Sequence, residues 1–336
     1  MTYNIKIQPS GHEFTTEEDE SVLDAALRQG INLPYGCRSG ECGACQGLLL
    51  SGKIYGQDEN ELSDGSVLFC QAQPASDLTI KIQEVDETRD ILIKKYPCRI
   101  EILEKLSHDV MRVKLKIPEM ERMQFLAGQY INILLDNDNP RSFSIANAPH
   151  DDEYIELHIR EIPGGKLTHQ IFHDMHRKDM LRIEGPLGSF FIREDSQRPL
   201  LLIGGGTGFA PLKGMLEHCF RTGLKQPIHL FWGAHGEQDL YLNKLPQQWA
   251  KEYKHFEYTP VLSGADDDGS WSGKKGLVTH LVVAKYPDLS GFDIYMSGAP
   301  DMIHSAVELF EKHGAQKERF FSDAFEFSAK PKKTNT

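Results

Sequence analysis

The chain has 336 residues and is 40% hydrophobic, enough apolar material for two or three separately packed domains. Its net charge of −12 argues against nucleic acid as a partner, because phosphates would be repelled. No apolar run approaches the ~20 residues of a membrane helix, and the N-terminus lacks the apolar core of a signal peptide. We therefore expect a cytoplasmic protein that does not bind membranes.

The negative charge is concentrated near the N-terminus. Residues 1–90 hold 16 Asp and Glu against 6 Lys and Arg, a balance of −10, so the remaining 246 residues carry only −2. Such a field could steer a basic redox partner, an effect that salt would weaken. The alternative, that the charge serves solubility alone, stays open.

The first part of the chain predicts a small β-grasp-like domain. Ser21 is expected to cap a helix over residues 22–29 that ends at Gly30. The expected strands, of which the first two form a hairpin, cover residues 3–8, 12–14, 46–54 and 78–82. Residues 85–93 then read as an acidic linker.

Four cysteines follow the predicted helix. Cys37, Cys42 and Cys45 have the spacing C-x4-C-x2-C, and Cys70 lies further along. This spacing is typical of plant-type ferredoxin loops, in which four thiolates hold a two-iron, two-sulfur cluster. Glycines within and beside the loop, Gly36, Gly40, Gly43 and Gly47, would let backbone N–H groups approach the sulfurs.

Two other interpretations of the cysteines fit less well. A structural zinc site usually pairs two C-x2-C units, and only one is present. A disulfide framework would leave the isolated Cys98 and Cys219 to explain, in a long chain without a secretory signal. We therefore predict Cys37, Cys42, Cys45 and Cys70 as metal ligands.

Two further domains follow the linker. Short alternating runs separated by turn residues, at 110–117, 130–135, 142–146 and 155–159, predict a compact antiparallel β-barrel. Apolar runs at 200–203, 228–232, 258–262 and 294–296, each beside a helix-like segment, predict a doubly wound α/β domain. The expected boundaries are 1–90, 96–197 and 198–328, followed by a disordered tail at 329–336.

A flavin site is predicted in the barrel. Arg141-Ser-Phe-Ser144 lies on a predicted strand, and Gly164-Gly-Lys-Leu-Thr168 opens a predicted helix. An arginine and a helix N-terminus can bind a pyrophosphate, and an aromatic face can pack on an isoalloxazine. A strand with a surface arginine is the alternative. The candidate cofactor-binding residues are Arg141, Ser142, Phe143, Ser144, His158, Arg160, Gly165, Lys166, Leu167 and Thr168.

A dinucleotide site is predicted where the apolar run at 200–203 enters a glycine-rich turn. Its candidates, Gly205, Gly206, Thr207 and Gly208, precede a helix-like stretch and so form a phosphate cradle, although the string is not G-x-G-x-x-G. A tight turn without a ligand is the alternative.

Two carboxylates after the next strand bear on the choice of coenzyme. Glu237 and Asp239 could accept ribose hydroxyls and would repel a 2′-phosphate, which favours NADH over NADPH. His235 could instead pair with a phosphate, and both carboxylates could simply be solvated loop charge.

Taken together, the three sites resemble those of ferredoxin-NADP reductase-type iron–sulfur flavoprotein reductases with an N-terminal plant-type ferredoxin domain. That family includes the reductases of benzoate dioxygenase and phenol hydroxylase, and the greatest likeness is to CDP-6-deoxy-delta-3,4-glucoseen reductases. The resemblance rests on Tyr96-Pro-Cys, Leu126-Ala-Gly-Gln-Tyr130, Arg141-Ser-Phe-Ser-Ile-Ala-Asn-Ala-Pro149, Ile183-Glu-Gly-Pro186, Gly204-Gly-Gly-Thr-Gly-Phe-Ala-Pro211 and Phe320-Phe-Ser-Asp-Ala-Phe325.

The resemblance implies site roles for several residues. Phe143 and Ser144 belong to a flavin motif that usually reads Arg-x-Tyr-Ser, so Phe143 keeps the aromatic face without the hydroxyl. Ser297 and Gly298 stand where the nicotinamide-side motif usually reads Cys-Gly. Phe325 and Phe327 are candidates for the aromatic ring that covers the flavin, and a hydrophobic C-terminal anchor is the alternative. The implied catalytic residues are Phe143, Ser144, Ser297 and Phe325.

The resemblance also implies the activity. NADH would reduce FAD, which would pass electrons singly through the cluster to a partner protein. That partner is expected to be a CDP-6-deoxy-sugar dehydrase, with a non-haem iron oxygenase component as the alternative. A redox carrier or sensor with incidental NADH turnover is a third hypothesis. We expect a monomer.

Overall fold

The computed structural model describes residues 2–56, 61–135, 140–264 and 271–324. They form two units, one of residues 1–92 with 188–190 and the other of residues 93–187 with 191–336. The candidates Phe325 and Phe327 and the predicted tail at 329–336 lie outside the described residues.

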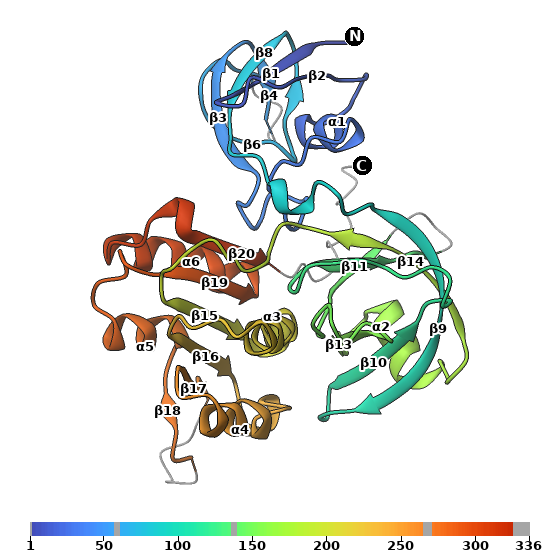
Figure 1. Cartoon of the computed structure of the whole chain (residues 1–336), viewed down its shortest axis with the longest axis vertical. Coiled ribbons are helices and arrows are strands. Elements are labelled where there is room, and N and C mark those ends of the chain that lie inside the picture. The colour runs from blue at the N-terminus through green and yellow to red at the C-terminus, as the bar shows by residue number, and fades with distance from the viewer. Residues whose placement is uncertain (1, 57–60, 136–139, 265–270, 325–336) are drawn as a thin grey trace, which may run out of the picture. The chain divides into compact units, whose positions relative to one another are not determined.

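The first unit, blue in Figure 1, is built on a five-stranded sheet in the order β2-β1-β8-β3-β6. β1 pairs antiparallel with β2, which confirms the predicted hairpin, and parallel with β8. The strands are β1 (Asn4–Gln8), β2 (Glu13–Thr15), β3 (Gln46–Ser51), β6 (Gly65–Leu68) and β8 (Leu78–Lys81). A small second sheet contains β4 (Ile54–Tyr55), β5 (Glu61–Leu62) and β7 (Gln73–Pro74), and η1 (Asp86–Thr88) follows β8.

The helix of this unit begins where the sequence predicts. The Ser21 side chain accepts a hydrogen bond from Asp24 N at 3.1 Å and so caps α1 (Val22–Arg28). Val22, Leu23, Ala25 and Ala26 are buried, so the apolar face of α1 packs into the core of the unit. The cysteine loop begins after this helix and is anchored at its other end by β3.

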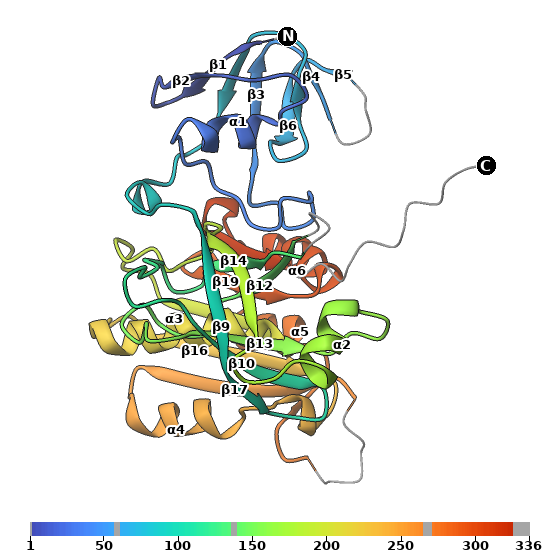
Figure 2. The same ribbon diagram turned by 90° about the vertical axis from the view of Figure 1, so that its right-hand side faces the viewer.

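The second unit begins with a six-stranded antiparallel sheet in the order β12-β11-β14-β9-β10-β13. An antiparallel bridge between Ile145 and Leu157 joins its two ends, which closes the sheet into the predicted barrel. Leu167 and Ile171 of α2 (Lys166–His173) belong to the barrel core, so this helix packs over the barrel (Figure 2). The strands are β9 (Lys94–Lys105), β10 (Val110–Lys116), β11 (Tyr130–Ile133), β12 (Arg141–Ser144), β13 (Ile155–Arg160) and β14 (Met180–Leu187).

The rest of the second unit is a parallel sheet in the order β18-β17-β16-β15-β19-β20. Its strands are β15 (Leu200–Gly205), β16 (Ile228–Ala234), β17 (Phe256–Leu262), β18 (Lys274–Lys275), β19 (Asp293–Gly298) and β20 (Phe320–Ala324). Its helices are α3 (Phe209–Thr222), α4 (Lys244–Glu252), α5 (Val278–Lys285) and α6 (Pro300–Lys312), with short turns η2 (Gly206–Gly208), η3 (Glu237–Asp239) and η4 (Lys317–Arg319).

The strand order of this sheet fixes where a ligand can bind. The chain runs outward from β15 to β17 and then returns to β19 on the other side of β15. Right-handed crossovers therefore place α3 and α4 on one face and α5 and α6 on the other (Figure 1). The reversal leaves a crevice at the carboxyl ends of β15 and β19, the usual ligand position in a doubly wound fold.

Candidate cofactor-binding sites

The cysteine loop follows a backbone path that L-residues rarely adopt. Arg38, Gly40 and Gly43 have φ values of 61°, 92° and 72°, all in the left-handed region. This path aims the N–H groups of Ser39 and Cys42 at the Cys37 sulfur, over 3.4 and 3.3 Å. Such donors favour a thiolate that carries negative charge, as a cluster ligand does.

The four thiols lie in two close pairs. The hydrogen bond with Cys42 lowers the pKa of Cys37 to about 4, and that same bond raises the pKa of Cys42. A hydrogen bond between Cys45 and Cys70 likewise raises the pKa of Cys45 and lowers that of Cys70. All four are free thiols, and all but Cys37 are buried. Two pairs of sulfurs beside backbone donors fit a cluster of two irons with two thiolates each.

The predicted flavin strand is β12, at the edge of the barrel sheet. Ser144 is buried, and its Oγ donates a hydrogen bond to Asp323 Oδ2 over 2.9 Å. Ser142 Oγ donates to Asn132 Oδ1 at 2.8 Å, while Phe143 is half-buried against the barrel core and Arg141 is half-buried beside it. Asp323 on β20 therefore belongs to this site, although the sequence analysis gave it no role.

A cleft of about 1010 Å³ lies beside the N-terminus of α2. It is lined by His108, Asp109, Arg160, Glu161, Ile162, Pro163, Gly164, Gly165, Lys166 and His169. Gly165 is the N-cap of α2 and provides no side-chain cap, so the first N–H groups of the helix remain available. The Nε of Arg160 lies 3.0 Å from Asp109 Oδ2. Its Nη2 is buried and has no hydrogen-bond partner among the described residues.

These features fit a diphosphate. An unpaired guanidinium nitrogen, Lys166 and a helix N-terminus are the groups that bind phosphate oxygens. Leu167 and Thr168 have structural roles instead: Leu167 is buried in the barrel core, and Thr168 Oγ1 accepts from Ile162 N–H at 3.2 Å and donates to the Gly165 carbonyl at 3.1 Å.

His158 does not fit the predicted role. Its side chain is fully buried, and both ring nitrogens are occupied: Nε2 lies 2.9 Å from Glu156 Oε1 and Nδ1 lies 3.0 Å from the Tyr241 hydroxyl. A carboxylate only accepts, so Nε2 donates and the neutral ring accepts at Nδ1. The ring therefore links the barrel to the parallel-sheet domain and offers no free nitrogen to a cofactor.

Lys213 of α3 joins the same network. Its Nζ donates to the Ala146 carbonyl at 3.0 Å and lies 3.4 Å from Glu156 Oε1. Burial would raise the pKa of Glu156, but the hydrogen bond from His158 and the charge of Lys213 hold it below its ordinary value. The network is thus a charged, buried connection between two parts of one unit.

The nicotinamide candidates meet in the crevice between β15 and β19. A Cβ on Gly208 would lie 2.0 Å from the Ser297 carbonyl oxygen, too close for any side chain to fit. A Cβ on Gly205 would lie 2.6 Å from Met302 Sδ and 3.7 Å from the Gly298 Cα. Ser297 Oγ is buried and has no hydrogen-bond partner in the described part of the chain. A tight cradle that ends beside an unpaired hydroxyl fits a bound dinucleotide.

The two carboxylates predicted for the ribose lie just after β16. Glu237 is exposed, whereas Asp239 Oδ2 accepts a hydrogen bond from the Gly236 N–H at 2.8 Å. Asp239 therefore stabilises its own turn through one oxygen. The position of both residues, at the carboxyl edge of the strand next to β15, is the one expected for a ribose contact.

Comparison with protein-family models gives three matches in the same order. Residues 5–75 match the 2Fe-2S iron-sulfur cluster binding domain, residues 97–192 the oxidoreductase FAD-binding domain, and residues 202–308 the oxidoreductase NAD-binding domain. These matches confirm the predicted fold class and the three predicted cofactors.

Curated relatives match along almost the whole chain. The CDP-6-deoxy-L-threo-D-glycero-4-hexulose-3-dehydrase reductase of Yersinia pestis is 37% identical over 97% of this chain and 99% of its own length. Protein RfbI of Salmonella typhimurium is 40% identical over 97% of both chains. The phenol hydroxylase P5 protein of Acinetobacter pittii is 34% identical over 96% of both.

A solved structure shares the fold over a similar extent. The Amycolatopsis cytochrome P450 reductase GcoB aligns with a TM-score of 0.77 and 28% identity, over 96% of this chain and 98% of its own. No helix in the described ranges has the length and apolar character needed to cross a bilayer. The chain belongs to the ferredoxin-NADP reductase-type family of iron–sulfur flavoprotein reductases, in which cluster-, FAD- and NAD-binding domains follow one another.

Proposed function

We propose that the protein oxidises NADH and delivers electrons one at a time to a separate protein. The observation that carries the proposal is that one chain holds a four-cysteine loop, a diphosphate cleft on a barrel and a dinucleotide crevice. When bound, FAD takes two electrons from NADH and a two-iron cluster takes them singly, so the three groups together convert two-electron into one-electron transfer.

The chain's own residues bind and orient these groups. Arg160, Lys166 and the N-terminus of α2 would hold the flavin diphosphate, and β12 would line the flavin. The Gly205–Gly208 turn and Ser297 would hold the nicotinamide coenzyme, with Glu237 and Asp239 favouring NADH over NADPH.

Removing one cluster ligand tests the order of electron flow. We expect Cys42→Ala to abolish reduction of cytochrome c while NADH oxidation with ferricyanide continues, because ferricyanide can take electrons from the flavin. Cys219→Ala is the matched control, since Cys219 is also a buried thiol but belongs to α3 and not to the cysteine loop. Normal cytochrome c reduction by Cys42→Ala would overturn the proposed path.

For the acceptor, we propose a dehydrase that acts on a CDP-6-deoxy sugar. Support comes from the Yersinia pestis relative, a dehydrase reductase that is 37% identical along nearly all of both chains. An oxygenase component is the second candidate, because the phenol hydroxylase P5 protein and a reductase component of terephthalate 1,2-dioxygenase are 34% and 33% identical. The partner is selected by surface shape and charge rather than by the redox sites.

Reconstitution distinguishes the two acceptors. NADH oxidation would be followed after adding either a CDP-6-deoxy-sugar dehydrase with its substrate or an oxygenase component with an aromatic substrate. We expect turnover that depends on both protein and substrate only with the dehydrase. Coupled turnover with the oxygenase alone would favour the second candidate, and very slow NADH oxidation by the fully loaded protein would favour a carrier or sensor.

We further propose a cytoplasmic monomer. Cys98 and Cys219, the two cysteines outside the predicted cluster ligands, are buried thiols that form no disulfide, as expected in a reducing compartment. Light scattering should give a mass near 38.0 kDa, and twice that mass would contradict the monomer. Recovery of the protein outside the cytoplasm on cell fractionation would contradict the location.

A further inference from the structure

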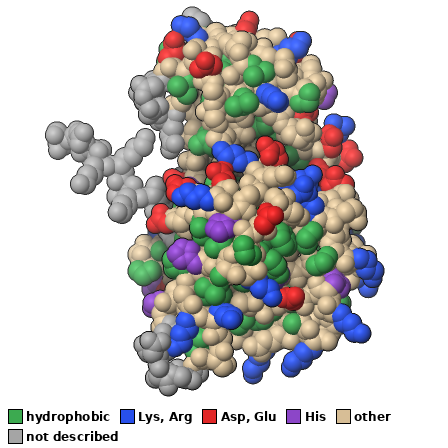
Figure 3. Space-filling view, turned by 90° about the vertical axis from the view of Figure 1, so that its left-hand side faces the viewer, with side chains coloured by type: hydrophobic (Ala, Val, Ile, Leu, Met, Phe, Trp, Pro, Cys, Tyr) green, Lys and Arg blue, Asp and Glu red, His purple; other side chains and the backbone are tan. Residues whose placement is uncertain are grey.

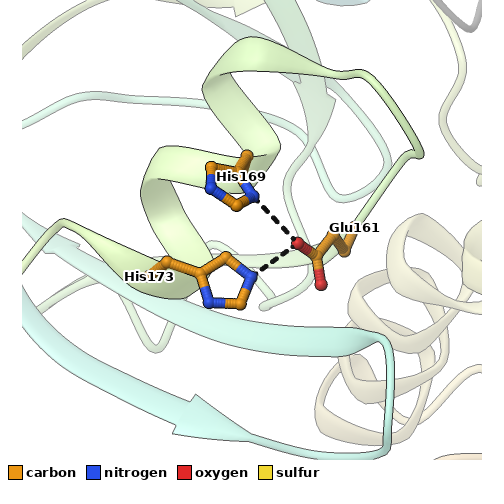
Figure 4. A group of neighbouring side chains, drawn as sticks. All are labelled: Glu161, His169 and His173. Atoms are coloured by element: carbon orange, nitrogen blue, oxygen red, sulfur yellow. Dashed lines mark hydrogen bonds and ion pairs between the residues drawn. The ribbon is translucent and has the colours of Figure 1, made fainter.

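Three side chains with metal-binding atoms meet at the surface of the barrel, beside the cleft that two of them, Glu161 and His169, help to line. His169 and His173 are one turn apart on α2 and lie on the same face, while Glu161 directly follows β13 (Figure 4). Glu161 Oε1 lies 2.7 Å from His173 Nε2 and 3.5 Å from His169 Nδ1. The two imidazole rings are 4.3 Å apart between centroids.

The geometry matches what a small divalent ion requires. Zn²⁺ bonds to His and Glu at about 2.0–2.2 Å, so tetrahedral ligand atoms are separated by roughly 3.4 Å. The three ligand atoms here all lie within 4.8 Å of one another. The distances from Glu161 Oε1 to His173 Nε2 and to His169 Nδ1, 2.7 and 3.5 Å, lie on either side of the roughly 3.4 Å expected for a tetrahedral site. We propose that Glu161, His169 and His173 form a binding site for a divalent transition metal, Zn²⁺.

The surroundings support an ion that enters from solvent. The side chains of His169 and His173 are 62% and 50% exposed, so water can complete the coordination shell. Two imidazoles and one carboxylate form a donor set that suits zinc.

A second group of acidic and histidine side chains does not offer the same chemistry. His108, Asp109 and Asp239 also approach one another, but Asp109 already pairs with Arg160 at 3.0 Å. Asp239 accepts a hydrogen bond from a backbone N–H, and only one imidazole is present. The cluster on α2 is thus the better metal site.

A bound ion would brace the turn that lines the cleft. It would tie α2, through His169 and its last residue His173, to Glu161 directly after β13, on either side of the turn at 162–165. Pro163, Gly164 and Gly165 of this turn line the cleft, and Gly164 has a φ of 77°. The metal would therefore stabilise the turn that leads into the helix N-terminus.

Equilibrium dialysis against Zn²⁺, with metal analysis of the protein, tests the site. The protein is used with its cluster and FAD in place, so that the cysteines are not free to bind zinc. Wild type is compared with Glu161→Gln and His173→Gln. His280→Gln on α5 is the matched control, because His280 is an exposed helical histidine outside the cluster. Circular dichroism checks that each variant is folded.

We expect wild type to retain one more Zn²⁺ per chain than either site variant. The affinity of that zinc should fall by about tenfold or more in Glu161→Gln and His173→Gln, and should be unchanged in His280→Gln. Zn²⁺ should also raise the melting temperature of wild type. It should not raise the melting temperature of folded His173→Gln. If wild type retains no zinc, or if both folded site variants bind as wild type does, the proposal is overturned.

Discussion

At the scale of single residues, Ser297 has an unpaired hydroxyl that the fold alone does not explain. It is buried without a partner among the described residues, and such a group costs about 1–3 kcal/mol. We expect Ser297→Ala to leave the free energy of unfolding unchanged or higher, while kcat/KM for NADH falls about tenfold. Thermal melts and NADH–ferricyanide kinetics measure the two effects. Lost stability with unchanged kcat/KM would contradict a coenzyme contact.

Buried histidines should make the fold sensitive to acid. Burial lowers the pKa of His158 and His229 to about 4, from an ordinary value of 6.5. Between these values the unfolded chain binds protons that the folded chain excludes, so stability falls as pH drops from 6.5 to 4. The loss is on the order of 3 kcal/mol for each histidine. Denaturant unfolding of His158→Gln should show a weaker pH dependence than wild type, and an identical dependence would contradict this assignment.

Some site residues belong to a motif within one short stretch of sequence, whereas others depend on contacts between residues far apart in the chain. The cluster-binding domain could be predicted from its cysteine loop, because a cluster requires three thiolates within one short stretch of chain. Asp323 could not, because it meets Ser144 across 179 positions of the chain. The contacts of His158 could not be predicted for the same reason, since its partner Tyr241 lies 83 positions away.

At the scale of elements, the turn from β15 into α3 depends on the absence of a side chain. A Cβ at Gly208 would lie 2.0 Å from the Ser297 carbonyl oxygen, so Gly208→Ala must push this turn away from β19. We expect a loss of roughly 1–3 kcal/mol in the free energy of unfolding and a higher KM for NADH. Gly291→Ala is the control, because nothing lies within 4 Å of its added Cβ. Equal effects in both variants would contradict the tight packing.

Most strands were predictable, because their side chains alternate or form continuous apolar runs. The run at 200–203 became β15, and Arg141–Ser144 became β12. Two strands, β14 and β20, were not predicted. β14 contains Gly185 and Pro186, which usually mark a turn, and β20 buries Ser322 and Asp323 where apolar residues would be expected. Both become strands through pairing with neighbours distant in sequence.

At the scale of the whole molecule, charge separates the two ends of the chain. Residues 1–90 carry −10 of the total −12, and Figure 3 shows Lys and Arg side chains gathered toward the bottom of the view, around the parallel-sheet domain. We expect reduction of cytochrome c, a basic protein, to slow about tenfold as salt rises from ~20 to ~200 mM. Reduction of the anion ferricyanide should not slow. If salt changes the rates of cytochrome c and ferricyanide reduction equally, the acidic charge does not steer a basic partner and serves solubility alone.

In the proposed function, electrons from NADH reach the cluster through the flavin of the same chain. An anaerobic titration of the fully loaded protein with NADH tests it most directly, with flavin followed by visible absorbance and the cluster by electron paramagnetic resonance. The account predicts that flavin absorbance bleaches and that the signal of a reduced two-iron cluster appears in the same titration. If neither centre responds although both are present, the account is wrong.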